Sequence, residues 1–189
     1  MSESFLFQGT LFPNVPSILD HGLRPRGEAP SNDERLGLAS LPDFVYLTNE
    51  PARAAFHAGR VSDEVHDGAP VAILEVPFAS LNKRLLYPDE DWIEDQHNSG
   101  ISSLPLEKKM RYMQRHKHEW RESLARYSTV AYRGVITGLR VWEPSPKVVI
   151  NRLVSTLHPC LSKMPGTGKR ETAFKTEPIF VFSMTRMEV

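Results

Sequence analysis

The stretch Val71–Phe78 constrains the fold more than any other part of the sequence. It is an almost continuous apolar run in which Glu75 is the only charged residue. Such a run is typical of a strand covered on both faces, so we expect it to lie centrally in a sheet. Pro77 cannot donate a ladder hydrogen bond, and the strand should therefore end near it.

Four other stretches contain the aromatic and β-branched residues that favour strands. They are Ser4–Thr10, Phe44–Thr48, Thr129–Ile136 and Pro178–Met184. Each is short and is bounded by residues that favour turns or helix starts. The sequence therefore predicts at least five short strands.

Helix signals separate these strands. Asn14 can cap a helix that ends at Gly22. Asn49 can cap a second, short helix over Ala52–Ala58, for which Gly59 is a plausible C-terminal stop.

The longest helical pattern covers Leu106–Arg126. Met110, Met113, Trp120 and Leu124 recur at helical spacing and predict its buried stripe. Lysines and arginines outnumber glutamates on the rest of its surface. We interpret this excess as a solvated helix face or, alternatively, as a surface that follows a phosphate backbone.

Strands and helices do not alternate regularly along the chain. This order favours an α+β fold with a mainly antiparallel, split sheet over a doubly wound parallel one. A chain of 189 residues is most simply one domain, residues 1–189, with a substantial buried core.

Charge and composition exclude little. Lysine plus arginine equals aspartate plus glutamate, 23 each, so net charge neither requires nor excludes nucleic acid. A single cysteine, Cys160, excludes an intramolecular disulfide. Met1–Thr10 shows no secretory pattern, and no apolar stretch approaches the ~20 residues that span a bilayer. We therefore expect a cytoplasmic protein without a membrane segment.

Three motifs suggest functional sites, but we interpret each of them as structural. The acidic cluster Asp89–Asp95 offers paired carboxylates for acid–base work or a hard cation, but a loop anchored by Trp92 is the favoured interpretation. The segment Met164–Arg170 lacks the glycine spacing and the Ser or Thr of a phosphate loop, so we expect a hairpin tip. His116 and His118 are two apart, the wrong spacing for one helix face, and no metal site is predicted.

Three blocks together resemble a known superfamily. Gln8-Gly9-Thr10 comes first, then Ser17-Ile18-Leu19-Asp20-His21-Gly22-Leu23-Arg24-Pro25, then Val45-Tyr46-Leu47-Thr48. In content and order they resemble the ADP-ribosyltransferases, most closely the branch that holds the tRNA 2′-phosphotransferases and the DarT-type toxins that modify nucleic acid. The similarity covers about residues 5–60, with a fainter one near 128–137.

The resemblance implies two small sheets with a central cleft for NAD, which serves as co-substrate. It implies that the backbone of Gly9 holds the nicotinamide carboxamide and that Tyr46 stacks on the ring, with Phe56 as a second stacking face. Thr10 and Thr48 belong to the same motif blocks and are expected at the NAD site.

The irregular loop over residues 24–43 closes over the dinucleotide in the family resembled. Arg24, Arg26 and Arg35 are the candidates for its phosphate contacts, because a guanidinium can hold phosphate oxygens bidentately. Each of them is equally well interpreted as a solvated loop charge.

Two positions depart from the family pattern. Gln8 replaces the first-strand histidine, and Ser128 or Thr129 stands where a catalytic glutamate is usual. We take Gln8, Tyr46, Thr129 and Arg133 as candidate catalytic residues; Arg133 and Glu122 are the nearest charged substitutes. The amide of Gln8 can still bond a ribose hydroxyl.

Three functions therefore remain open. The first is a mono-ADP-ribosyltransferase that cleaves the nicotinamide–ribose bond of NAD, with nucleic acid slightly preferred over protein as acceptor. The second is an RNA 2′-phosphotransferase that uses NAD. The third is a non-catalytic module that binds NAD or ADP-ribose.

Overall fold

The computed structural model describes residues 4–27, 40–65, 68–144 and 184–186. Two compact units divide the chain: Met1–Pro144 with Thr185–Val189, and Ser145–Met184. Because the second unit lies almost wholly outside the described residues, the single domain over 1–189 stays a prediction. Arg35, the segment Met164–Arg170 and most of Pro178–Met184 also lie outside them.

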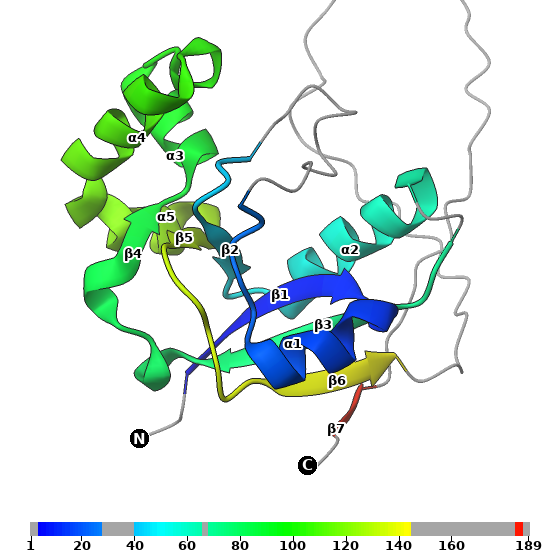
Figure 1. Cartoon of the computed structure of the whole chain (residues 1–189). Helices are drawn as coiled ribbons and strands as arrows, with labels where there is room; N and C mark the ends of the chain where they lie inside the picture. The colour runs from blue at the N-terminus through cyan, green and yellow to red at the C-terminus, as the bar shows by residue number, and fades with distance from the viewer. Residues whose placement is uncertain (1–3, 28–39, 66–67, 145–183, 187–189) are drawn as a thin grey trace, which may run out of the picture. The chain divides into compact units, whose positions relative to one another are not determined.

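The fold is α+β, as predicted, and its strands form an antiparallel sheet (Figure 1). The strand order is β4-β5-β2-β1-β3-β6-β7, and each of the first five neighbouring pairs is antiparallel. The strands are β1 (Phe5–Leu11), β2 (Val45–Thr48), β3 (Val71–Pro77), β4 (Leu86–Pro88), β5 (Thr129–Tyr132), β6 (Arg140–Pro144) and β7 (Met184–Arg186).

Five α-helices and several 3₁₀ turns join the described strands. The helices are α1 (Val15–His21), α2 (Pro51–Val65), α3 (Glu90–His97), α4 (Leu106–Arg115) and α5 (Trp120–Tyr127). The 3₁₀ turns are η1 (Phe12–Asn14), η3 (Phe78–Ser80), η4 (Lys83–Leu85), η5 (Ile101–Ser103) and η6 (Lys117–Glu119). Among the described residues, no helix has the length and apolar character to cross a membrane.

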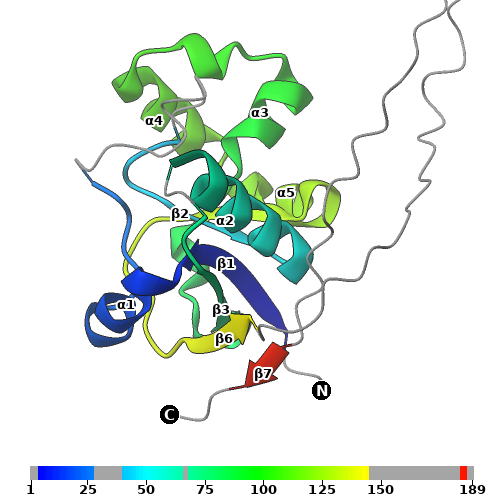
Figure 2. The same cartoon turned by 90° about the vertical axis from the view of Figure 1, so that its right-hand side faces the viewer.

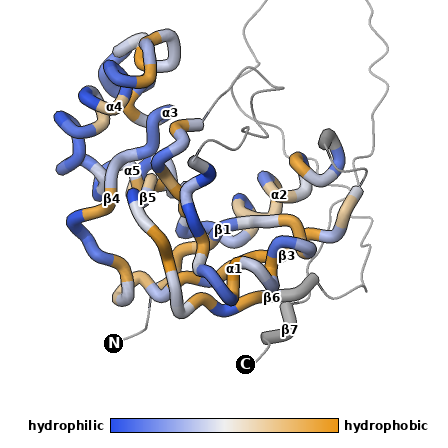
Figure 3. The backbone as a smooth tube through the Cα atoms, viewed as in Figure 1, coloured by the Kyte–Doolittle hydropathy of each residue, from blue (hydrophilic) through white to orange (hydrophobic). Residues whose placement is uncertain are grey.

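The central strand is predicted correctly. Residues Val71–Val76 of β3 are all buried, and β3 pairs with β1 on one side and β6 on the other. Figure 3 shows its apolar colour along the middle of the sheet. Glu75, the charged exception, is buried and bonded to Arg140 of β6 at 3.2 Å. Pairing with a cation across the sheet reduces the cost of burying the carboxylate.

Two buried clusters lie on opposite faces of the sheet. The first combines residues of β1 and β3, such as Leu6 and Leu74, with Leu47 of β2 and Val15 of α1. The second is built on β2, β4 and β5 and is covered by α3 and α4; its members are Leu41, Phe44, Tyr87, Trp92, Ile93, Ile101, Met113 and Ala131. Helices α3, α4 and α5 gather beside β4 and β5, whereas α2 lies against β1 (Figures 1 and 2).

One predicted helix boundary and one predicted loop are wrong. Helix α2 continues past Gly59 to Val65, because Ala54, Ala58 and Ser62 form a buried stripe that packing stabilises. The acidic cluster is not a loop: Asp89 caps α3 by accepting the Asp91 N–H at 2.9 Å.

The long helix predicted over Leu106–Arg126 is broken into α4 and α5. The break falls at His116 and the short turn η6, where the backbone leaves helical geometry (φ −94°, ψ 10° at His116). His116 bonds Glu119 three residues later at 2.8 Å. Such a local contact holds the chain in a tighter turn than an α-helix allows. The strand predicted over Thr129–Ile136 is likewise shorter, since β5 ends at Tyr132.

The sheet is continuous in the strand order, so the predicted pair of separate sheets is not found among the described residues. It is nevertheless nearly divided. Strands β1 and β3 share seven residue pairs and β2 and β5 share four, but β1 and β2 meet at one pair only, Phe7 and Thr48. Two halves therefore meet at a single residue pair: β4-β5-β2, and β1-β3-β6 with β7 at its outer edge.

Candidate functional site

The junction between β1 and β2 contains several, but not all, of the predicted site residues. We define the β1–β2 junction as Gln8, Gly9 and Thr10 of β1 with Val45, Tyr46 and Leu47 of β2. Beyond the Phe7–Thr48 pair these two segments are neighbours in the strand order but do not pair with each other. The structure thus brings together two of the three motif blocks.

Gln8 and Tyr46 do not face each other. Side chains alternate along a strand, and Gln8 follows Leu6 onto the face of the first buried cluster. Tyr46 packs instead against the second cluster, on the opposite face. The side chains of Gln8 and Tyr46 could therefore reach NAD only from opposite faces of the sheet.

The side chain of Gln8 is unusual because its amide oxygen is buried without a hydrogen-bond partner among the described residues. An unpaired buried carbonyl oxygen costs about 1–3 kcal/mol. A hydroxyl or amide donor from a ligand would remove that cost, which fits the predicted contact with NAD.

Gly9 serves helix packing. A Cβ at this position would lie 2.1 Å from the carbonyl oxygen of Ala54 and 2.7 Å from the Cβ of Ala58, both in α2. Because Gly9 has no Cβ, helix α2 can pack directly against the backbone of β1 at this position. Since α2 covers that side of Gly9, only the backbone groups of Gly9 that α2 does not cover could make the predicted contact with the nicotinamide carboxamide.

Tyr46 is tied by its hydroxyl group. The hydroxyl accepts the Leu41 N–H at 3.0 Å and interacts electrostatically with the nearby carboxyl group of Glu90. Burial, together with the nearby Glu90 and Asp89 carboxylates, raises the pKa of Tyr46 well above its ordinary value. The hydroxyl therefore stays protonated and can donate to Glu90.

Two acids with raised pKa values lie at the turn between β4 and α3. Burial and then the neighbouring Asp89 carboxylate raise the pKa of Glu90 to about 7. Burial and then the Asp91 carboxylate raise the pKa of Asp89 to about 6. Acids poised near neutral pH are suited to proton transfer. We call Asp89 and Glu90 the acid pair.

Asp89 lies beside Thr129, one of the two positions at which the family resembled has its catalytic glutamate. Its carboxylate interacts with the nearby side chain of Thr129, which favours the charged form. Its backbone N–H donates to the hydroxyl of Ser123 at 2.9 Å, and that hydroxyl donates to the Thr129 carbonyl at 2.8 Å. A buried network thus holds Asp89 on Thr129, one of the predicted catalytic residues.

A third acid contacts Ser128, the other position considered for that glutamate. The Ser128 hydroxyl donates to Glu50, whose carboxylate also lies 3.5 Å from Arg53. Arg53 in turn donates to the carbonyl of Tyr127. Glu50 is exposed and follows directly after β2.

Sequence reasoning missed the acid pair as partners of Tyr46 and Thr129. The cluster Asp89–Asp95 was visible, but nothing in the spacing shows that β4 pairs with β5, as in Tyr87 opposite Ala131. That pairing carries the acid pair to the β2–β5 side of the sheet. The only available signal was the abrupt change from an apolar stretch to consecutive acids.

The other predicted site residues are scattered. Arg24 is exposed and donates to the His21 carbonyl at 3.0 Å, while Arg26 donates to Ser40 at 2.8 Å. Phe56 is 64% exposed, two residues beyond Ala54, and so lies on the side of α2 turned away from β1. Arg133 forms an ion pair with Asp43 at 3.0 Å. It follows the last residue of β5, whereas Thr129 is the first residue of that strand.

The two threonines occupy different faces. Thr10 comes two residues after Gln8 and therefore lies on the same face of β1, opposite Ala72 of β3. Thr48 is buried, and its hydroxyl accepts the Glu50 N–H at 3.1 Å, ending β2. Neither Phe56 nor Arg133 is brought to the β1–β2 junction, and Glu122 is exposed on α5.

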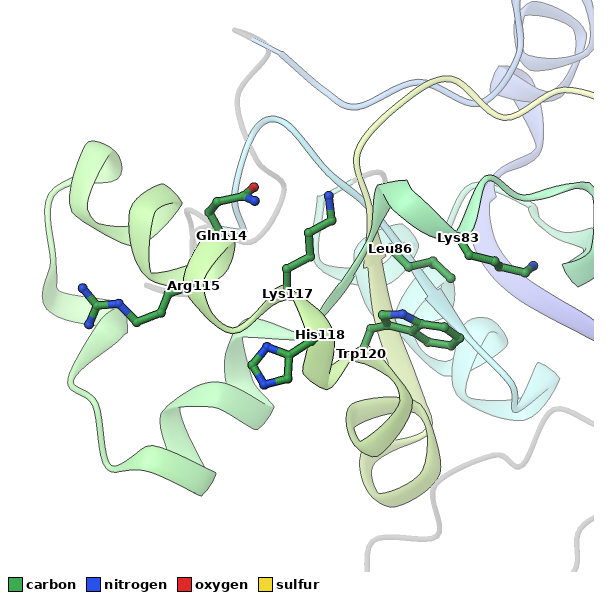
Figure 4. A pocket seen from close by; sticks show the side chains of 7 residues that line it. All are labelled: Lys83, Leu86, Gln114, Arg115, Lys117, His118 and Trp120. Carbon is green, nitrogen blue, oxygen red and sulfur yellow. The ribbon is translucent and has the colours of Figure 1, made fainter.

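A shallow basic pocket lies elsewhere on the described part of the chain, with a volume of about 360 Å³. Figure 4 shows the side chains that line it: Lys83, Leu86, Gln114, Arg115, Lys117, His118 and Trp120. Lys117 lies over the Tyr87 ring at 4.4 Å. Burial lowers the pKa of Lys83, which donates to the Phe78 carbonyl.

Comparison of the chain with models of protein families, with curated proteins and with solved structures gives no match. The function of the chain is therefore inferred from its own residues and their geometry.

Proposed function

We propose that this chain is an NAD-dependent mono-ADP-ribosyltransferase. It would break the bond between nicotinamide and ribose and transfer ADP-ribose to a macromolecule, with nucleic acid as the preferred acceptor. The observation that carries the proposal is the contact of the acid pair with Tyr46 and Thr129. These contacts supply carboxyl groups to two motif positions in a chain that lacks the usual motif glutamate.

The chemistry assigns a role to Glu90. When the bond from ribose C1′ to the nicotinamide nitrogen breaks, its electron pair leaves with nicotinamide and positive charge develops on the ribose. A nearby carboxylate stabilises that charge. The acceptor oxygen or nitrogen then bonds to C1′ and loses its proton. With a pKa of about 7, Glu90 is a suitable base for that proton.

The near-division of the sheet supports the same proposal. Under it, the halves β4-β5-β2 and β1-β3-β6 correspond to the two small sheets of the family resembled, and NAD binds where β1 and β2 diverge beyond Phe7 and Thr48. The buried, unpartnered oxygen of Gln8 would accept a hydrogen bond from NAD on the face opposite to Tyr46.

The first test is nicotinamide release from NAD by Glu90→Gln, which keeps the size of the side chain and removes its acid. We expect a loss of about 100-fold or more, the usual size of a general acid–base contribution. The matched control is Glu107→Gln, an exposed glutamate of α4, which should retain full activity. Tyr46→Phe keeps the ring and should also lose activity through misplacement of Glu90.

Equal rates for Glu90→Gln and the unaltered chain would exclude Glu90 from the reaction. If the unaltered chain binds NAD in calorimetry but releases no nicotinamide with any acceptor offered, the chain is a binding module and the proposed activity is wrong. Phosphate transfer from a 2′-phosphorylated RNA to NAD would assign the alternative transferase reaction.

The basic pocket favours nucleic acid as the acceptor, since Lys83, Arg115 and Lys117 line one concave surface and cations on such a surface attract phosphates. Labelled NAD incubated with the chain in a cell lysate, followed by separate nuclease and protease digestion, tests this preference. We expect nuclease to release the label. Release by protease alone would make protein the acceptor.

A further inference from the structure

Two histidines and a glutamate meet on the helical side of the described structure, apart from the acid pair. His97 is the last residue of α3, whereas His116 precedes the turn η6 between α4 and α5 and Glu119 is the last residue of that turn. Nε2 of His97 lies 2.8 Å from Oε2 of Glu119, and Nδ1 of His116 lies 2.8 Å from Oε1. One potential ligand atom from each residue lies within 4.8 Å of the other two.

We propose that His97, His116 and Glu119 form a binding site for a divalent transition-metal ion, with Zn²⁺ as the ion that the donor set fits best. Two imidazole nitrogens and one carboxylate oxygen are a recognised Zn²⁺ ligand set that leaves a fourth position for water. We call these three residues the His–His–Glu cluster.

The distances suit a metal-free form of such a site. Ligand atoms around a tetrahedral Zn²⁺ with bonds of about 2.0–2.2 Å are a little more than 3 Å apart. The nitrogen–oxygen pairs at 2.8 Å would therefore open by about half an ångström. In the metal-free form, hydrogen bonds hold these atoms together, and binding would release the shared protons.

Packing orients both imidazole rings before any metal binds. The ring of His116 is stacked on Tyr112 at 4.6 Å, and the ring of His97 is edge-on to Trp92 at 5.9 Å. The side chains of His97, His116 and Glu119 are 28%, 16% and 16% exposed. The cluster is thus partly buried and remains open to an ion from solvent. Fixed rings and controlled solvent access raise the affinity of a metal site.

A metal in this position would stabilise the acid-bearing helix. Helix α3 begins at Glu90 and ends at His97, while the other two ligands lie just before and at the end of the turn between α4 and α5. Binding would join the end of α3 to that turn. The cluster and Glu90 lie at opposite ends of α3, so the ion would not contact the acid pair directly.

The test uses the full chain after treatment with a chelator. Zn²⁺ is titrated in competition with a chromophoric chelator, and Co²⁺ is added separately to record its visible absorption. We expect about one equivalent of tightly bound Zn²⁺, intense Co²⁺ bands of a four-coordinate site, and a higher melting temperature with Zn²⁺. His97→Ala and His116→Ala should each weaken Zn²⁺ binding by about 100-fold or more.

His21→Ala is the matched control, since His21 is exposed on α1 and bonded only locally to Ser17. It should bind Zn²⁺ like the unaltered chain. Glu119→Gln keeps an oxygen for one hydrogen bond but removes the carboxylate, and it should also weaken binding. Far-UV circular dichroism establishes that each variant folds.

Two results would overturn the proposal. One is the absence of saturable Zn²⁺ binding by the folded, unaltered chain. The other is unchanged affinity in both folded histidine variants, which would assign the ion to other donors and leave the cluster as a hydrogen-bonded link between helices.

Discussion

At the residue scale, Gly9 sets the distance between β1 and α2. An added Cβ would lie 2.1 Å from a backbone oxygen of α2. A helix backbone cannot relieve such a clash by changing rotamer, as a flexible side chain can. We expect Gly9→Ala to reduce the free energy of unfolding by about 1–3 kcal/mol, the usual cost of overpacking. Urea denaturation of both proteins measures it.

Gly59→Ala is the control for this substitution. Gly59 lies inside α2, and a Cβ there would meet nothing within 4 Å. Alanine favours a helix interior over glycine by about 0.5–1 kcal/mol, so this variant should gain stability. If both variants show the same change, the contact between Gly9 and α2 does not limit packing.

Glu90 should make stability fall as the pH rises. Its pKa is about 7 in the folded protein against an ordinary 4.5, so the folded state holds a proton that the unfolded chain has lost. The associated stability is present below pH 4.5 and is lost as the pH rises to about 7.

Glu90→Gln should remove the contribution of Glu90 to this decline. It should stabilise the protein at pH 8 by about 3 kcal/mol, since the pKa is raised from 4.5 to about 7 and one pKa unit corresponds to about 1.4 kcal/mol. Denaturant unfolding at a series of pH values compares it with Glu107→Gln, which should keep the original profile. A Glu90→Gln profile as steep as that of the unaltered chain would contradict the raised pKa.

At the scale of elements, Ser123 joins α5 to the start of α3 and to β5. Its fully buried hydroxyl accepts the Asp89 N–H and donates to the Thr129 carbonyl. Ser123→Ala would leave two buried backbone groups without that partner. We expect a loss of about 1–3 kcal/mol in the free energy of unfolding.

Thermal or urea denaturation measures the effect of Ser123→Ala. Ser80→Ala is the comparison, because the exposed Ser80 hydroxyl bonds only the Pro77 carbonyl three residues earlier; it should change stability by less than about 0.5 kcal/mol. Equal losses in the two variants would show that the buried link adds nothing to stability.

At the scale of the whole described structure, the two buried clusters should respond differently to cavities. The first contains residues of both sheet halves, such as Leu74 of β3 and Leu47 of β2, whereas the second belongs to the β4-β5-β2 half and its helices. Leu74→Ala and Ile93→Ala each remove a fully buried side chain and should cost about 2–5 kcal/mol.

Hydrogen exchange followed by mass spectrometry distinguishes the two effects. Leu74→Ala should accelerate exchange in β1, β3 and β2 alike, while Ile93→Ala should accelerate it mainly in α3 and α4, because a cavity first destabilises the cooperative unit that contains it. The same exchange pattern in both variants would mean that the halves unfold as one unit.

Local rules were sufficient for part of this fold. The sequence by itself determined β1, α1, β2 and β3, because alternation, an apolar run, a proline near the helix start and Gly22 at its end act within a few residues. It also determined the α+β class. These signals depend on backbone preferences and burial, which neighbouring residues reveal.

Only the tertiary structure decided where the chemistry lies. The pairing of β4 with β5 brings Glu90 to Tyr46, and the turn after α4 brings His116 to His97. The continuation of α2 past Gly59 likewise depends on tertiary contacts, since Ser62 is buried and donates to the carbonyl of Ala69. Contacts between distant segments follow from how whole faces pack together, and no local pattern records them.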